Sequence, residues 1–499
     1  MNREEILDRI RSRNTPWDFI VIGGGATGVG CAVDAASRGY DVLLLEQHDF
    51  GKGTSSRSTK LVHGGVRYLA QGNISLVREA LKERGILLNN APHVVHKQAF
   101  IVPCYSRWQK FYYGMGLKVY DLLAGKYSLG RSRILSRKET IERLPTVRKD
   151  GLAGGILYFD GQFDDTRLLI DLVTTAHKYG SAVLNYARVT SIVKTTAGKV
   201  GGVEFEGVSN GEKFYAEAKV VINATGAFCD AVRTMSDNAV KPIVTLSQGT
   251  HLVFDRKFLP SDAAVMIPKT RDGRVLFCIP WHGHTLVGTT DTPIANAALE
   301  PQALESEIDF VIETAAAYLE QRPTRQDILS VFTGIRPLVT SSATTNTASL
   351  SRGHTIEIDA SNLLTITGGK WTTYRRMAED AVNQATRLAG LDMRSSVTKD
   401  LKIEAPHEAA TATELLHPDL PYTRADVIQA VREELAQTVE DVLARRTRAL
   451  FLNANAAIEM ARTVAKIMAN DMNKDIMWVE DQIDNFSKIA ERYVSVARP

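Results

Sequence analysis

The strongest constraint on the fold is a glycine pattern, Gly23-x-Gly25-x-x-Gly28, placed directly after the apolar β-branched run 19–22. A helix-compatible stretch follows it, and then a second apolar run of strand length at 41–46. Strand, glycine turn, helix and strand within roughly 30 residues predict a βαβ unit whose strands are parallel. The first glycine of such a turn permits the tight bend, the second lets a pyrophosphate approach the backbone, and the third lets the helix pack closely on the strand. The pattern therefore predicts a dinucleotide site.

The helix and the second strand of this unit supply two polar contacts that a dinucleotide needs. The helix N-terminus offers unpaired N–H groups and a partial positive charge to the diphosphate. Glu46, at the end of the second strand, offers a carboxylate to the ribose hydroxyls. The unit alone does not distinguish FAD from NAD. Later strand-to-glycine turns at 224–226 and 367–370 favour FAD, because an extended dinucleotide held by one domain needs several strand ends around it; otherwise they are ordinary turns.

The rest of the chain predicts three structural units. The apolar runs before these glycine turns are interpreted as separated pieces of one doubly wound sheet. Alternating strand patterns between them indicate an inserted antiparallel domain, and apolar residues recur at helical spacing from Thr423 onward. We therefore expect an α/β protein with a discontinuous Rossmann-like FAD-binding domain, an inserted antiparallel-sheet substrate domain and an all-α C-terminal domain. The expected ranges are 17–75, 165–240 and 350–395 for the FAD-binding domain, 76–164 and 241–349 for the substrate-binding domain, and 400–499 for the helical domain.

Composition and charge exclude several classes of protein. Of the 499 residues, 44% are hydrophobic and 23% are charged, which excludes an intrinsically disordered chain. The formal net charge of +3 is too small for nucleic-acid binding by the whole protein, so no nucleic-acid partner is expected. The four cysteines stand far apart, so we expect no disulfide framework and no thiolate metal site. The N-terminus lacks a signal-peptide core and no run of about 18 apolar residues occurs, so we expect a protein on the cytoplasmic side.

Residues 54–69 carry the sequence TSSRSTKLVHGGVRYL, which closely resembles the flavin-contacting segment of the FAD-dependent, quinone-linked glycerol-3-phosphate dehydrogenases. Related amino-acid oxidases share the glycine signature but not the motif around Arg336. Arg57 and Thr59 depart from the family pattern, in which a small residue and a serine are usual. Further segments that resemble this family lie at 249–251, 280–281, 288–291, 334–338 and 368–375, and the run 431–447 resembles its helical cap domain.

The resemblance implies oxidation of sn-glycerol 3-phosphate to dihydroxyacetone phosphate. A hydride would pass from C2 to N5 of FAD, and the electrons would then pass to a membrane quinone. A glycerol-3-phosphate oxidase that uses oxygen is the nearest alternative, and an amino-acid or amine oxidase, whose arginine would hold a carboxylate, is a more distant one. A non-catalytic FAD-binding sensor or membrane scaffold is the alternative that is not an enzyme. The sequence leaves the oligomeric state open, a homodimer included.

Such a reaction needs an anion clamp, a proton acceptor and positive potential near the flavin. Arginine suits the clamp because its planar fork donates two parallel hydrogen bonds to a phosphate. The resemblance assigns this role to Arg336 and Arg352. His251 is the expected proton acceptor, because imidazole titrates near neutral pH, and His63 is the alternative. Lys370, just before a predicted helix, is expected to stabilise negative charge on the flavin.

The site residues expected from these motifs form three overlapping sets. Catalytic roles are expected for His251, Lys370 and Arg336. Substrate contacts are expected from Arg336, Arg352, Lys370, His251 and Thr373. Contacts with FAD are expected from Gly23, Gly25, Gly28, Glu46, Ser55, Ser56, Ser58, Lys60, Leu61, His63, Gly64, Gly65, Val189, Ala224, Gly226, Gly369, Lys370 and Thr372.

A basic and aromatic segment, residues 104–138, is the candidate membrane contact. It holds eight lysines and arginines but a single acid, Asp121, and aromatic residues such as Trp108 and Phe111 lie between the basic residues. Basic and aromatic side chains together suit the headgroup region of an anionic bilayer. The segment therefore predicts peripheral attachment to the cytoplasmic membrane, and an RNA contact or a plain solvated face is the alternative.

Overall fold

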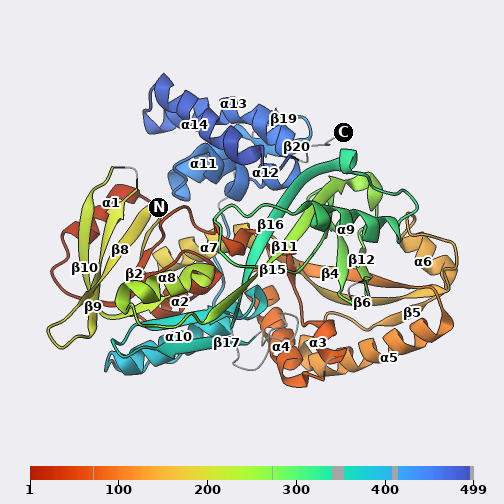
Figure 1. Ribbon diagram of the computed structural model, residues 1–499, viewed down its shortest axis with the longest axis horizontal. Coiled ribbons are helices and arrows are strands. Elements are labelled where there is room, and N and C mark those ends of the chain that lie inside the picture. Colours follow the sequence, from red (N-terminus) through yellow and green to blue (C-terminus); the bar gives the residue numbers. More distant parts are fainter. Residues whose placement is uncertain (71, 209, 272, 340–352, 407–413, 495–499) are drawn as a thin grey trace.

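The computed structural model describes residues 1–70, 72–208, 210–271, 273–339, 353–406 and 414–494. Two large sheets lie side by side, and the C-terminal helices lie along one edge of both (Figure 1). The expected α/β class, with a Rossmann-like sheet built from separated segments, a second sheet and a C-terminal helical region, is confirmed.

Strand β1 (Trp17–Ile22) lies inside the first sheet, whose order is β17-β18-β10-β1-β2-β7. It pairs in parallel with β2 and β10, and Phe19, Ile20 and Val21 are fully buried, as expected for the central strand of a parallel sheet. Strand β17 pairs antiparallel at the edge, and β8 and β9 extend β10 as an antiparallel ribbon. These strands are β2 (Val42–Leu45), β7 (Ala182–Leu184), β8 (Ala187–Lys194), β9 (Val200–Gly207), β10 (Lys213–Asn223), β17 (His354–Ile358) and β18 (Leu364–Gly368).

Helix α2 (Ala26–Ser37) follows the glycine turn and packs against α7 (Asp165–Lys178) and α10 (Tyr374–Leu388). Gly30 permits this close packing, because a Cβ at that position would come within 2.9 Å of the Tyr374 ring. Helices from three distant parts of the sequence thus join one layer. Helices α1 (Arg3–Arg11) and α8 (Cys229–Ser236) contact β7 and β8 respectively.

The second sheet has ten strands in the order β15-β11-β14-β13-β12-β4-β6-β3, with β16 on β11 and β5 on β6. The sheet was expected to be antiparallel, but β12 pairs with β4 in parallel. The two strands come from different segments of the chain, so no hairpin fixes their relative direction. The strands are β3 (Leu61–Val62), β4 (Val95–Cys104), β5 (Arg133–Leu135), β6 (Gly154–Phe163), β11 (Val244–Asp255), β12 (Ala264–Ile267), β13 (Leu276–Trp281), β14 (His284–Gly288), β15 (Thr292–Ile294) and β16 (Ile328–Val339).

The helices beside the second sheet and the short turns between elements complete this part of the fold. The helices are α3 (Val66–Ala70), α4 (Ile74–Asn90), α5 (Arg107–Ala124), α6 (Arg137–Arg143) and α9 (Glu305–Ala316). The 3-10 turns are η1 (Thr54–Ser56), η2 (Gly125–Tyr127), η3 (Gly226–Phe228), η4 (Arg256–Phe258), η5 (Arg325–Asp327) and η7 (Trp371–Thr373). Among the described residues, no helix is both long and apolar enough to cross a bilayer.

The C-terminal region is mainly helical but not all-α as expected, because a hairpin of β19 (Leu415–His417) and β20 (Leu420–Thr423) precedes its helices. Thr423 and Asp426 form the predicted capping box at the first helix. The elements are α11 (Arg424–Glu433), the π-helix η8 (Asp441–Arg446), α12 (Ala449–Leu452), α13 (Ala454–Met472) and α14 (Ile476–Ala490).

Buried charges join the C-terminal helices to the first sheet. Asp49, just after β2, accepts hydrogen bonds from Arg445 and Arg446 of η8. Burial raises the pKa of the Asp49 carboxyl, but the two guanidinium groups outweigh it and hold that pKa below its usual range. Arg448 donates to the carbonyl of Ser56 and to the hydroxyl of Thr166. The C-terminal region therefore fixes the loop that follows β2.

Candidate active site

The glycine turn after β1 brings backbone very close to backbone. Gly23 has φ +112°, and a Cβ there would come within 2.7 Å of the carbonyl oxygen of Ala224. A Cβ at Gly28 would overlap the carbonyl oxygen of Gly23. Only glycine fits either position, which is the close approach that the sequence pattern predicted.

A groove of about 340 Å³ runs along the ends of the parallel strands beside this turn. Glu46 accepts hydrogen bonds from the N–H groups of Gly24 (2.6 Å) and His48 (2.8 Å), and burial raises its pKa. Ser55 accepts one from Ala26 at the start of α2. The expected FAD contacts that line this groove are Gly23, Gly25, Glu46, Ser55, Val189, Ala224, Gly226, Gly369 and Lys370. A long cleft with a helix start and a carboxylate at its wall fits an extended dinucleotide.

Other expected FAD contacts shape the walls instead of lining the groove. Ser58 and Lys60 donate to the same carboxylate oxygen of Asp165, at 2.7 and 2.6 Å. Ser56 donates to the carbonyl of Gly51, and the N–H of Gly64 donates to Asp160. These residues fold the segment that crosses from the first sheet to the second. Leu61, His63 and Gly65 line a second cavity, and Thr372 contacts the backbone of His63.

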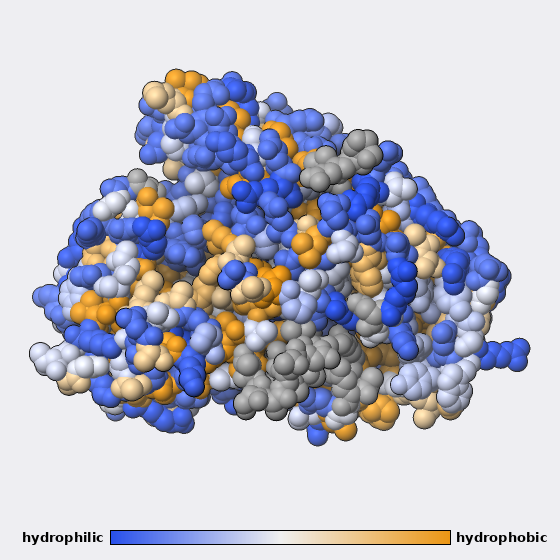
Figure 2. All heavy atoms as spheres, viewed as in Figure 1, coloured by the Kyte–Doolittle hydropathy of each residue, from blue (hydrophilic) through white to orange (hydrophobic). Residues whose placement is uncertain are grey.

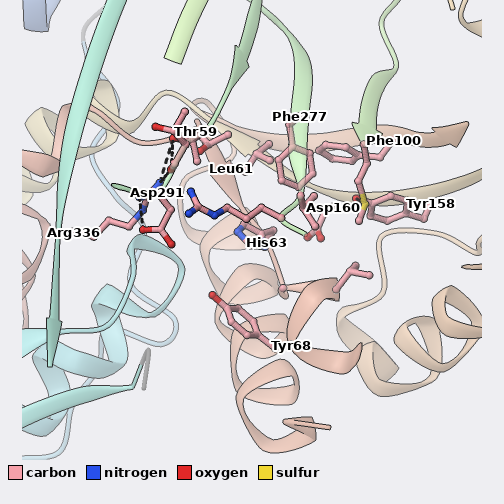
Figure 3. A pocket seen from close by; sticks show the side chains of 17 residues that line it. Thr59, Leu61, His63, Tyr68, Phe100, Tyr158, Asp160, Phe277, Asp291 and Arg336 are labelled. Carbon is pink, nitrogen blue, oxygen red and sulfur yellow. Dashed lines mark hydrogen bonds and ion pairs between the residues drawn. The ribbon is translucent and has the colours of Figure 1, made fainter. Parts of the chain in front are cut away.

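The second cavity, of about 160 Å³, has two chemically different ends (Figure 3). Phe100, Tyr158 and Phe277 lie at one end, and Arg336 and Asp291 lie at the other. The wall includes polar and apolar residues from β3, α3, β12, β13 and β16. The lining residues are Thr59, Leu61, His63, Gly65, Val66, Tyr68, Phe100, Tyr158, Asp160, Met266, Arg274, Val275, Phe277, Thr289, Thr290, Asp291 and Arg336.

Arg336 donates hydrogen bonds to acceptors on β11 and in the loop between β14 and β15. Its guanidinium donates to the carbonyls of Thr290 (3.0 Å) and Gln248 (3.3 Å), to the hydroxyl of Thr289 (3.2 Å) and to Asp291 (3.4 Å). The next residue, Pro337, lines the groove, so β16 presents consecutive residues to the two spaces. A rigid cation therefore stands where the cavity and the dinucleotide groove come together.

His251 is buried behind the cavity wall and is not among the residues that line it. Its ring stacks on Phe332, with centroids 4.8 Å apart, and its Nε2 lies 2.9 Å from the hydroxyl of Thr59. Burial, then the charges of Lys60 and Arg336, lower the pKa of His251 well below 6.5. The imidazole is therefore neutral at physiological pH, and it reaches the cavity through Thr59.

The remaining expected substrate residues are spread over different places. Lys370 lines the groove, and its ammonium lies 5.2 Å from the centroid of the Tyr68 ring. Thr373 donates to the carbonyl of Lys370 and lines neither of the two spaces. Arg352 lies outside the described residues. Arg336 and Lys370 thus come near the junction of groove and cavity.

Comparison with known proteins identifies the family. The profile of the family described as FAD dependent oxidoreductase matches residues 18–375, and that described as the C-terminal domain of alpha-glycerophosphate oxidase matches residues 364–478. The mitochondrial glycerol-3-phosphate dehydrogenase of Rattus norvegicus is 39% identical over 530 aligned positions, which cover 95% of this chain and 73% of that protein. The chain belongs to the FAD-dependent glycerol-3-phosphate dehydrogenase family.

Other members and solved structures agree with this assignment. A mitochondrial member from Arabidopsis thaliana is 37% identical, over 96% of this chain and 87% of its own length. The glycerol-3-phosphate dehydrogenase of Bacillus halodurans, solved with FAD, has a TM-score of 0.79 at 27% identity and covers 100% of this chain and 99% of its own. The L-alpha-glycerophosphate oxidase of Mycoplasma pneumoniae shares the fold, with a TM-score of 0.58 at 17% identity over 78% of this chain and 98% of its own. FAD is therefore the cofactor of this family member.

Several cavity residues were missed by the sequence analysis. Tyr68 lines the cavity and belongs to the segment 54–69, but its sequence context was given no role. An aromatic residue shortly after the pair Gly64-Gly65 could have indicated a cavity residue. Arg274 stands alone before an apolar strand, and its sequence gives no such signal. Arg57, which departs from the family pattern, donates to Glu300 at 2.8 Å, and its guanidinium lies 5.7 Å from the Tyr493 ring. The Arg57 side chain therefore contacts the C-terminal region and lines neither space.

Proposed function

We propose that the protein oxidises sn-glycerol 3-phosphate to dihydroxyacetone phosphate and is a quinone-dependent dehydrogenase. The observation that carries this proposal is Arg336, a fixed guanidinium at the polar end of a cavity next to the dinucleotide groove. Bound FAD supplies the acceptor for the hydride that leaves C2. The residues of this chain bind the phosphate, place the C2 hydroxyl and take its proton.

Arg336 is the proposed phosphate clamp. Three neutral acceptors and the carboxylate of Asp291 fix its orientation, so little side-chain entropy is lost when an anion binds. Its ion-pair contact with Asp291 is 3.4 Å long. Arg352, outside the described residues, stays the proposed second clamp.

His251 is the proposed acceptor of the hydroxyl proton, and Lys370 the proposed source of positive potential. A neutral imidazole has a free lone pair, and the lowered pKa of His251 keeps it in that state. Lys370 lines the dinucleotide groove at the start of η7, where its ammonium and the helix start favour negative charge on the reduced cofactor. Thr373, which donates to the Lys370 carbonyl, is proposed to hold this turn.

The electron acceptor decides between the proposed dehydrogenase and the oxidase alternative. The relatives are named dehydrogenases, which favours an acceptor other than oxygen, and a quinone is the acceptor that we propose. The C-terminal match to an oxidase family keeps oxygen as the second candidate. Purified holoenzyme with glycerol 3-phosphate should reduce a soluble quinone analogue under argon and form little peroxide under air. One peroxide released per dihydroxyacetone phosphate formed, with no quinone reduction, would select the oxidase.

We also propose that α5 attaches the protein peripherally to the cytoplasmic membrane. Trp108 is 70% exposed and Leu122 is 81% exposed, and one helix face repeats such residues at spacings of three and four. Separate orange patches lie among more hydrophilic atoms at the lower edge of the molecule, where α5 lies (Figures 1 and 2). The exposed apolar residues of α5 are Trp108, Phe111, Tyr112, Met115, Val119 and Leu122. Such a face, flanked by the basic residues of 104–138, suits an anionic bilayer.

Flotation with vesicles containing phosphatidylglycerol tests this attachment. The double variant Trp108→Ser and Leu122→Ser should lose binding that the wild type shows, and binding should weaken at high salt. The matched control is Ile476→Ser with Met477→Ser, two residues 64% and 72% exposed on α14, at the opposite edge in Figure 1. Equal loss in both pairs, or in neither, would contradict the assignment to α5.

A further inference from the structure

The imidazole of His251 is separated from the cavity by one hydroxyl group. Thr59 lines the cavity, and its Oγ1 lies 2.9 Å from Nε2 of the buried His251. From this arrangement we infer that Thr59 relays the C2 hydroxyl proton of the substrate to His251. The inference rests on the proposed function and adds a catalytic residue to it.

The pairing of strands β11 and β16 sets the distance between Arg336, the proposed phosphate clamp, and His251, the proposed proton acceptor. Ser247 pairs with Arg336, Gly249 with Gly334 and His251 with Phe332, so these pairs share one face of the sheet. A Cβ at Gly249 would overlap the guanidinium of Arg336, which therefore lies over that glycine. His251 stands two residues further along the same face, roughly 7 Å away at the usual strand rise. This spacing suits a phosphate at the arginine and a hydroxyl oxygen three bonds beyond the ester oxygen.

The loop that carries Thr59 is fixed against the same face. A Cβ at Gly334 would come within 2.8 Å of the carbonyl oxygen of Arg57, so only glycine lets the loop approach so closely. On either side of Thr59, Ser58 and Lys60 both donate to Asp165. On the neighbouring strand β14, a Cβ at Gly288 would overlap the imidazole of His251. Hydroxyl and imidazole therefore meet with little freedom to separate, as proton transfer requires.

The proposed relay moves two protons in one direction. The O–H bond of the C2 hydroxyl breaks and its proton forms a new O–H bond on Thr59. The proton that Thr59 carried passes to Nε2 of His251, which becomes an imidazolium, while the C2 hydride leaves to FAD. Lys60 and Arg336 disfavour the imidazolium. The bound phosphate offsets the charge of Arg336, so His251 is a better base with substrate present than without it.

Stopped-flow reduction of the flavin in the holoenzyme tests the relay. Thr59→Val keeps the shape but removes the hydroxyl, and it should slow reduction by roughly 100-fold or more, the range of general acid–base catalysis. Thr59→Ser should restore the rate to within roughly 3-fold, because it replaces the hydroxyl. The dissociation constant of glycerol 3-phosphate should rise by no more than roughly 10-fold in Thr59→Val, the loss of one neutral hydrogen bond, and stay near the wild-type value in Thr59→Ser. A wild-type rate in Thr59→Val would overturn the relay, and loss of that rate in His63→Asn instead would make His63 the acceptor.

The proton inventory of the wild type tests the relay without a variant. The rate of flavin reduction, plotted against the fraction of D₂O in the solvent, should give a curved line because two protons move in the same step. A straight line would overturn the relay. Either result presupposes that glycerol 3-phosphate bleaches the wild-type flavin. Failure of the proposed function is thus seen as the absence of bleaching, and failure of the relay as bleaching that is indifferent to Thr59.

Discussion

Removing the guanidinium of Arg336 should weaken substrate binding far more than it slows the chemistry. A hydrogen bond to a charged group contributes about 1.5–3 kcal/mol, and a bidentate phosphate contact has two of them. The Arg336 side chain is 25% exposed, so solvent screening favours the lower end of that range. A total near 3 kcal/mol corresponds to a roughly 150-fold rise in the dissociation constant of glycerol 3-phosphate for Arg336→Ala. Arg336→Lys keeps the charge but loses the fork, and roughly 10-fold is expected.

The same substitution also removes the cation beside Asp291, whose side chain is 7% exposed and also accepts a hydrogen bond from Ser247. A second variant, Arg336→Ala with Asp291→Asn, removes the buried negative charge that has lost its cation and separates folding from binding. If the clamp is right, the double variant regains thermal stability but not affinity. Affinity is measured by spectral titration of the bound flavin, and Arg256→Ala, an exposed arginine paired with Asp262, is the control. A dissociation constant within 2-fold of the wild type in Arg336→Ala would refute the clamp.

Three further variants test other parts of the account. Gly288→Ala should displace the ring of His251 and slow flavin reduction at unchanged substrate affinity, and an unchanged rate would show that the ring position does not matter. Because the pKa of His251 is lowered well below 6.5, the ratio of wild-type to His251→Asn reduction rates should stay constant from about pH 8 to 6.5, and a ratio that halves near 6.5 would contradict this. Below 6.5 the unfolded chain binds a proton that the native His251 does not, so this residue lowers native stability as the pH falls. Asp49→Asn removes the carboxylate that Arg445 and Arg446 share, although Arg445 keeps Glu440 and Asp441 and Arg446 keeps a longer contact with Glu434. The loss should cost about 3 kcal/mol in urea unfolding, and a loss below about 1 kcal/mol would contradict the buried network.

Local sequence patterns predicted the parts of the fold whose cause is local. The turn Gly23-x-Gly25-x-x-Gly28 follows from backbone contact between neighbouring segments, and the capping box at Thr423 lies within one helical turn. No local sequence pattern indicated the parallel pairing of β4 with β12 or the hairpin before α11. The pairing joins segments more than a hundred residues apart, and the hairpin strands are only three and four residues long.

The candidate site was predictable in its residue types more than in its geometry. Arg336 lines the cavity and Glu46 lines the groove, because β16 carries the arginine and the end of β2 carries the carboxylate. The side chain of Lys60 donates to Asp165 and to the carbonyl of Ser56, two partners that its own segment of sequence does not indicate. The burial of His251 depends on Phe332, which comes from a different strand. Partners from distant segments decide such details, and one segment of sequence does not contain them.

Anaerobic titration of the purified yellow holoenzyme with glycerol 3-phosphate tests the central claim most directly. Each equivalent of substrate should bleach one equivalent of oxidised flavin and yield dihydroxyacetone phosphate, whereas glycerol, which has no phosphate for Arg336, should bleach little at the same concentration. Flavin that stays yellow with glycerol 3-phosphate but bleaches with glycine or D-alanine would contradict the account.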